Sequence, residues 1–125
     1  MPAIWEAEAA PTEWGGYEGT CALLQGSEIP TAFLCATDSM AIGALRALKE
    51  RGLRAGQDVA VIGHDNLPSA AFLDPPLSTM EIDAPDIGRD LADLLIARLG
   101  GGAARDLQTI LPIRQVPRAT HRPPH

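Results

Sequence analysis

Long hydrophobic runs are missing from this 125-residue sequence, since no apolar stretch approaches the roughly 18 residues that a membrane-spanning helix needs. The first residues, MPAIWEAEAAP, also lack the basic start and apolar stretch of a secretory signal. We therefore expect a cytoplasmic protein with no membrane contact. With 46% hydrophobic and 21% charged residues, the composition is that of one soluble globular domain.

Cysteine is equally scarce, and this argues against a disulfide framework. The two cysteines, Cys21 and Cys35, lie among apolar neighbours, as reduced core thiols do. His121 and His125 have the spacing of a metal pair on a helix, but Arg-Pro-Pro between them forbids a helix. We expect no metal and no disulfide.

Clustered positive charge is also absent: ten Lys and Arg residues are scattered against sixteen acids, for a net charge of −6. Binding to phosphates requires clustered cations, so we expect no direct nucleic acid contact by this chain. The run of three glycines, Gly100 to Gly102, follows a helix instead of opening one, so we expect no phosphate loop. No Ser or Cys nucleophile in a recognisable setting accompanies His64 and Asp65, so we expect neither an enzyme nor a cofactor.

The most informative segment predicts two buried parallel strands joined by a helix. Short apolar runs at Ala32 to Ala36 and Val59 to Gly63 are typical of strands buried on both faces. Asp38 is expected to cap the intervening helix, and Gly52 to end it. This helix has an apolar stripe at Ala41, Ala44, Leu45 and Leu48.

The flanking segments are less regular. Residues 1–16 are expected to form an irregular lead-in, and residues 121–125 a disordered tail. Between them we predict a helix at 17–26, a loop or single helical turn from Pro68, a strand at 78–82, a helix at 84–99 capped by Asp83, and an edge strand at 107–116.

Asp65 is the strongest candidate for binding a ligand. It follows the second strand, at the sheet edge where open α/β folds place their ligand contacts, and Thr37 ends the first strand at that same edge. The alternative for Asp65 is a turn acid that bonds the loop backbone. Trp14, Tyr17 and Phe72 could stack on a ligand such as a sugar ring, although core or interface packing is the commoner role of aromatic residues. Because neighbours in an extended segment point to opposite sides, we expect His64 to point away from Asp65.

Four motifs in order make the sequence similar to the effector-binding domain of LacI/GalR-type transcription regulators. They are PTAFLCATDSMAIGALRALKERGL, DVAVIGHDN, LDPPLST and LPIRQVPRAT, with Arg118 and Thr120 in the last. The resemblance implies an α/β fold: part of a type I periplasmic-binding-protein-like subdomain, with a parallel sheet and flanking helices, over residues 17–120.

The resemblance also implies roles for individual residues. Asp65 and Thr37 match positions that contact the effector, Asp38 matches the family's helix-opening acid, and Trp14 or Tyr17 fall in the aromatic region that lines the pocket. A homodimer is implied, with contacts at Ile42, Leu45 and Leu73. Thr37 replaces the family's usual Asn and His64 its usual aromatic residue, so the resemblance does not identify the effector.

Three functions remain open at this point. The leading hypothesis is a ligand-sensing segment of a transcription regulator, with a sugar or related metabolite as effector and the DNA-binding head outside this chain. The alternatives are a solute-binding component of a sugar transporter and a stand-alone dimerisation module. We also expect the chain to self-associate through uncovered sheet edges.

Overall fold

The computed structural model describes residues 3–103 and 108–122, and its centre is a four-stranded sheet in the order β1-β2-β3-β4. β1 (Ala32–Leu34), β2 (Ala60–His64) and β3 (Ser78–Glu81) are parallel, and β4 (Arg114–Val116) runs antiparallel to β3. The parallel order of β1 and β2 across an intervening helix confirms the predicted strand-helix-strand unit. The α/β class is therefore correct.

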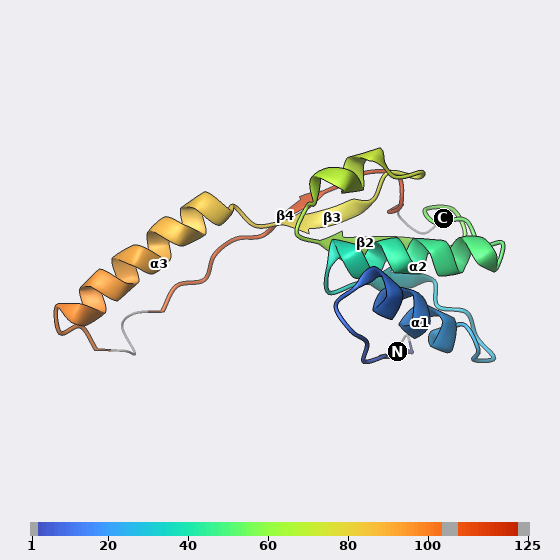
Figure 1. Ribbon diagram of the computed structural model, residues 1–125, viewed down its shortest axis with the longest axis horizontal. Coiled ribbons are helices and arrows are strands. Elements are labelled where there is room, and N and C mark those ends of the chain that lie inside the picture. The colour runs from blue at the N-terminus through green and yellow to red at the C-terminus, as the bar shows by residue number, and fades with distance from the viewer. Residues whose placement is uncertain (1–2, 104–107, 123–125) are drawn as a thin grey trace.

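Two helices cover this sheet: α1 (Glu13–Leu23) and α2 (Asp38–Glu50) lie together on one side of it in Figure 1. The predicted stripe of α2 is confirmed, with Ala41, Ala44 and Leu48 fully buried and Leu45 half-buried. These side chains belong to a core that also contains Leu24, Phe33, Val59, Val61, Ala70 and Leu77.

α1 begins at Glu13, inside the segment that was expected to be irregular, and ends at Leu23. Thr12 caps it by accepting from the backbone N–H of Gly15. The sequence pattern missed this start because Gly15 and Gly16 are poor helix formers. Their missing side chains are what α2 requires, since a Cβ on Gly16 would collide with the backbone carbonyl of Met40. Tertiary packing therefore outweighs local propensity in this turn.

The predicted cap of α2 is wrong: the capping residue is Thr37. Its hydroxyl accepts from the backbone N–H of Met40 at 3.2 Å, and Thr37 has extended backbone angles. Asp38 is the first helical residue, and its carboxylate bonds elsewhere. Either side chain suits a helix start chemically, so the sequence alone did not separate them.

β1 also differs from the prediction of a strand buried on both faces. Only Phe33 is buried, whereas Ala32 and Leu34 are exposed, Leu34 by 81%. β1 is the outer strand of the sheet, and α2 and the core cover only the face that bears Phe33. A run of apolar residues therefore did not indicate burial on both sides.

Beyond β2, the chain forms a single 3₁₀ turn, η1 (Pro68–Phe72), as predicted from its prolines. The C-terminal strand is shorter than predicted: of residues 107–116, Leu107 lies outside the described residues and only Arg114–Val116 pair with β3. Thr120 then closes the core, because its buried hydroxyl donates to the Val61 carbonyl and accepts from the Ser78 N–H, both at 2.8 Å.

α3 (Ala84–Leu99) extends away from the rest of the chain (Figure 1). We call the part formed by α1, β1, α2, β2 and η1 the body. The predicted cap is confirmed, because Asp83 accepts from the backbone N–H of Asp86 at 3.3 Å. None of the 16 residues of α3, all of them described, is buried. In the described part of the chain no helix combines the length and apolarity needed to cross a membrane. Of the predicted tail, residues 123–125 lie outside the described residues.

Candidate ligand-binding site

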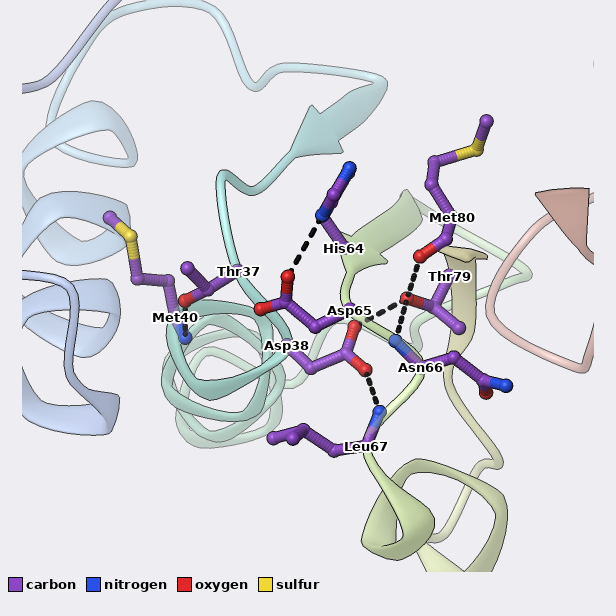
Figure 2. A network of polar contacts seen from close by, with 9 residues as sticks. All are labelled: Thr37, Asp38, Met40, His64, Asp65, Asn66, Leu67, Thr79 and Met80. Carbon is purple, nitrogen blue, oxygen red and sulfur yellow. Dashed lines mark hydrogen bonds and ion pairs between the residues drawn. The ribbon is translucent and has the colours of Figure 1, made fainter. Parts of the chain in front are cut away.

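The carboxyl ends of β1 and β2 form the edge at which the sequence placed a ligand. The two strands are parallel and in register, with Phe33 opposite Val61 and Leu34 opposite Ile62. Thr37 follows β1 and Asp65 follows β2, so both lie at this edge, beside the N-terminal end of α2 (Figure 2). Open α/β sheets bind ligands at such edges.

Asp65 has an unusual backbone conformation, with φ at 111°, and Asn66 follows at 52°. Side chains other than glycine rarely adopt positive φ, and a strained residue costs on the order of 1–3 kcal/mol. The neighbouring strand β3 holds Asp65 there, because the backbone N–H of Asp65 donates to the Met80 carbonyl at 2.9 Å. Strain of this kind concentrates at binding and catalytic sites.

A buried carboxylate supports the loop from below. Asp38, which is fully buried, accepts a 2.6 Å bond from the Thr79 hydroxyl and a 2.8 Å bond from the Leu67 N–H (Figure 2). Gly63 allows this approach, because a Cβ there would collide with the carboxylate of Asp38. Asp38 also lies in the first turn of α2, where the helix dipole favours negative charge. It positions the loop instead of capping the helix, a role that its sequence position did not reveal.

The side chain of Asp65 is 47% exposed and meets His64, whose Nδ1 lies 3.0 Å from Asp65 Oδ1. The expectation that these neighbours point apart is therefore wrong. The extended geometry behind it ends at His64, and the positive φ of Asp65 turns its side chain back toward the imidazole. An exposed carboxylate at this edge can accept hydrogen bonds from hydroxyl or amine groups of a ligand.

Thr37 retains a hydrogen-bonding function besides its cap. Its oxygen accepts from Met40, which leaves the hydroxyl proton free to donate. The edge thus combines one acceptor, Asp65, with one donor, Thr37.

The structure does not bring Trp14 and Tyr17 together with Asp65. The Tyr17 hydroxyl donates to Glu50, in the last turn of α2, at 2.7 Å, whereas the site lies beside the first turn of that helix. Trp14 stacks on Tyr17 with ring centroids 5.2 Å apart, and the Arg46 guanidinium lies 5.4 Å from the Tyr17 centroid. The hydrogen bond to Glu50 is the main cause that raises the pKa of Tyr17 to about 12. These aromatic rings and charges form a surface cluster of their own.

The predicted dimer residues lie on α2 and directly after η1. Ile42 and Leu45 are half-buried on α2, and Leu73 is half-buried directly after η1. Phe72, for which the sequence allowed ligand stacking or core or interface packing, is 89% exposed beside Leu73. Within residues 3–103 and 108–122, no three His, Cys, Asp or Glu side chains are arranged to hold a metal ion.

Comparison with known proteins gives a consistent result across methods. The family model described as a periplasmic binding protein-like domain matches residues 2–121. The HTH-type transcriptional repressor PurR of Haemophilus influenzae (strain PittEE) is 39% identical over 95 residues, which cover 76% of this chain and 28% of that protein. The lactose operon repressor of Escherichia coli (strain K12) is 37% identical over 117 residues, or 94% of this chain and 32% of that protein. The chain thus spans about a third or less of these two relatives.

A shorter relative is matched almost completely. The lactose operon repressor of Rhizobium radiobacter is 41% identical over 111 residues, which cover 87% of this chain and 96% of that sequence.

Solved structures agree with these sequence matches. A sugar-binding transcriptional regulator of the LacI family from Escherichia coli, complexed with phosphate, superposes with a TM-score of 0.81 at 32% identity, over 98% of this chain and 45% of that chain. The Lac repressor dimer bound to operator and the anti-inducer ONPF gives a TM-score of 0.76 at 35% identity, over 87% and 33% of the two chains.

Proposed function

This chain belongs to the LacI family of transcription regulators, and we propose that it forms the part of their effector-binding domain in which Asp65 contacts a small effector. The observation that carries this proposal is the conformation of Asp65: a strained acid at the carboxyl edge of the sheet, in a loop that bonds to Met80 of β3 and to Asp38 of α2. A plain turn acid would need neither the strain nor the buried support of Asp38.

The chemistry of the edge supports a sugar or another polyhydroxylated metabolite. The exposed carboxylate of Asp65 accepts hydrogen bonds from ligand hydroxyls, and the Thr37 hydroxyl donates one. Charge-assisted bonds of this kind contribute roughly 1.5–3 kcal/mol each when sheltered from water. Matches to regulators named for lactose and for sugar binding favour the same class of effector.

We further propose that the opposite wall of the pocket and the DNA-binding head are formed by residues other than these 125. The PurR repressor and the Escherichia coli lactose operon repressor are about three to four times as long as the part that aligns here. The exposed leucines of α3, Leu91, Leu95 and Leu99, are consistent with this arrangement, because a helix that packs against a second subdomain keeps an apolar face. A transcription regulator must reach its DNA operator, and this requirement supports a cytoplasmic location.

For the intact regulator we propose a homodimer, in which effector binding shifts an equilibrium between domain arrangements. Ile42 and Leu45 on α2 and Leu73 after η1 are partly exposed apolar residues available for such contacts, and the ring of Phe72 beside Leu73 is exposed. Because the curated matches described above are repressors, we favour this function over a transporter component.

The test is thermal unfolding of the chain with and without 100 mM lactose, ribose or galactose. A ligand that binds the native state with a Kd of about 1 mM would stabilise it by roughly 2.7 kcal/mol at that concentration. The shift should vanish in Asp65→Ala and persist in Asp93→Ala, which removes an exposed acid of α3. An unchanged shift in Asp65→Ala would contradict the role given to this residue.

A further inference from the structure

Asn66, which follows Asp65 in the loop, is bonded through its side chain to two other segments. Its amide oxygen accepts from Arg118 Nη2 at 2.7 Å, and its amide nitrogen donates to Glu81 Oε1 at 2.8 Å. These contacts span 52 and 15 residues of sequence. The amide oxygen and the amide nitrogen of Asn66 thus both bond to residues outside the loop.

The two partners belong to the strand pair that carries α3. Glu81 ends β3, just before the helix cap Asp83, and Arg118 follows β4, the strand by which the chain returns. Glu81 also forms an ion pair with Arg114 of β4. Figure 1 shows that β3 and β4 connect the body to α3, and we call this pair the stalk.

Arg118 is itself held at the start of β3, at the opposite end of that strand from Glu81. Its Nη1 donates to the Leu77 carbonyl at 2.7 Å, and its backbone N–H donates to the Ser78 hydroxyl at 2.8 Å. Asn66 therefore joins the loop to a rigid part of the stalk, and not to a freely moving side chain.

We propose that Asn66 is a positioning residue that couples the Asp65 loop to the direction of the stalk and α3. A ligand that moves Asp65 also moves Asn66, because the two are adjacent in a loop with constrained backbone angles. Asn66 then displaces Glu81, the last residue of β3, and Arg118, which follows β4. The proposal rests on the proposed function only for the role of Asp65, since the connection itself exists without ligand.

Asparagine is well suited to this position for two physical reasons. Its φ of 52° lies in the left-handed region, which asparagine tolerates better than most residues. Its amide also provides an acceptor for Arg118 and a donor for Glu81 at once, whereas an aspartate would place like charges together. Hydrogen bonding by Asn66, followed by the contact with Arg114, lowers the pKa of Glu81, which is consistent with a shared network.

The experiment measures the direction of α3 without any ligand. Spin labels are attached at Lys49→Cys in α2 and Asp93→Cys in α3. The native cysteines are first removed as Cys21→Ser and Cys35→Ala. Pulsed electron paramagnetic resonance then gives the distribution of distances between the two labels, and so between the body and α3. Excess unlabelled chain suppresses distances between molecules. We expect a roughly twofold broader distribution in Asn66→Gly, because glycine accepts the positive φ but removes both contacts.

Two controls make the outcome decisive. Asp65→Asn keeps the network and should leave the distribution unchanged. A second label pair within the body, Lys49→Cys with Ala71→Cys in η1, should give the same width with and without Asn66→Gly. The proposal is overturned if Asn66→Gly leaves the α3 distribution unchanged, or if it broadens the body distribution equally, since Asn66 would then only stabilise its loop.

Discussion

The hydroxyl of Thr79 donates a 2.6 Å hydrogen bond to the carboxylate of Asp38, and both side chains are fully buried. This pair joins β3 to the first turn of α2 beneath the loop that holds Asp65 (Figure 2). Since a buried carboxylate needs hydrogen-bond partners, the contact stabilises the fold and fixes the base of the site.

Thr79→Val should therefore lower the free energy of unfolding by about 2 kcal/mol, because it removes a bond to a buried charged group while keeping the shape of the side chain. Urea unfolding followed by circular dichroism measures the change. Thr31→Val, at an exposed threonine, should cost no more than about 0.5 kcal/mol. Equal costs at the two sites would contradict the role of Thr79.

Two glycines in helices should respond oppositely to alanine. A Cβ on Gly43 would collide with the backbone carbonyl of Glu13 in α1, whereas a Cβ on Gly88 in α3 meets no atom within 4 Å. Gly43→Ala should destabilise the chain by about 1–3 kcal/mol or more, and Gly88→Ala should favour α3 by up to about 1 kcal/mol. Urea unfolding measures the effect of Gly43→Ala on the stability of the chain, and hydrogen exchange of the α3 amides measures the effect of Gly88→Ala on that helix. Destabilisation by Gly88→Ala would show that α3 packs against the body.

Self-association should depend on α3 as well as on sheet edges. Its apolar side chains Leu91, Leu95 and Leu99 are 57%, 59% and 79% exposed. Leu95→Lys should lower the average mass measured by sedimentation equilibrium, because a charge interrupts this surface. Asp93→Lys, on the opposite side of the helix, adds the same residue and should leave association unchanged. A wild-type chain that stays monomeric at high concentration would refute the prediction.

Tyr17 should ionise at unusually high pH. The contact with Glu50 raises its pKa from 10.0 to about 12 in the folded chain. A raised pKa means that the stabilising contribution is complete below pH 10 and is lost as the pH rises through 12. Tyr17 is the only tyrosine, so absorbance at the tyrosinate wavelength reports it alone.

Glu50→Gln should shift the tyrosinate titration back toward the ordinary value, while circular dichroism at each pH shows that the chain remains folded. Ionisation of wild-type Tyr17 near pH 10 in the folded state would contradict the observed contact.

Much of this fold could be predicted from local hydrophobic patterns and from the residues that start, end or interrupt helices. The stripe from Ala41 to Leu48 predicted the buried face of α2, and prolines in the segment from Pro68 predicted a single helical turn there. Asp83 was identified correctly as a cap because no competing residue precedes it. At the start of α2, two adjacent candidates compete, and the choice depends on Thr79 and Leu67, which are distant in sequence.

The candidate site was predictable only in part. Parallel strand order placed Asp65 and Thr37 at one edge, but the positive φ that brings His64 to Asp65 depends on the bonds of Met80 and Asp38 to the loop. The direction of α3 depends on its connection through β3 and β4, and no periodic pattern encodes it. Roles that arise from contacts across more than forty residues, such as Thr79 with Asp38, have no local signal.

Binding of the effector by the Asp65 loop is tested most directly by a heteronuclear NMR titration of the ¹⁵N-labelled chain with lactose, ribose and galactose. Even half a pocket with a millimolar Kd, about −4 kcal/mol, gives measurable shifts. We predict saturable shifts for at least one sugar that centre on the amides of Thr37, Asp65 and Asn66 and disappear in Asp65→Ala. Shifts confined to other surfaces, or none at saturating concentrations of all three sugars, would contradict the claim.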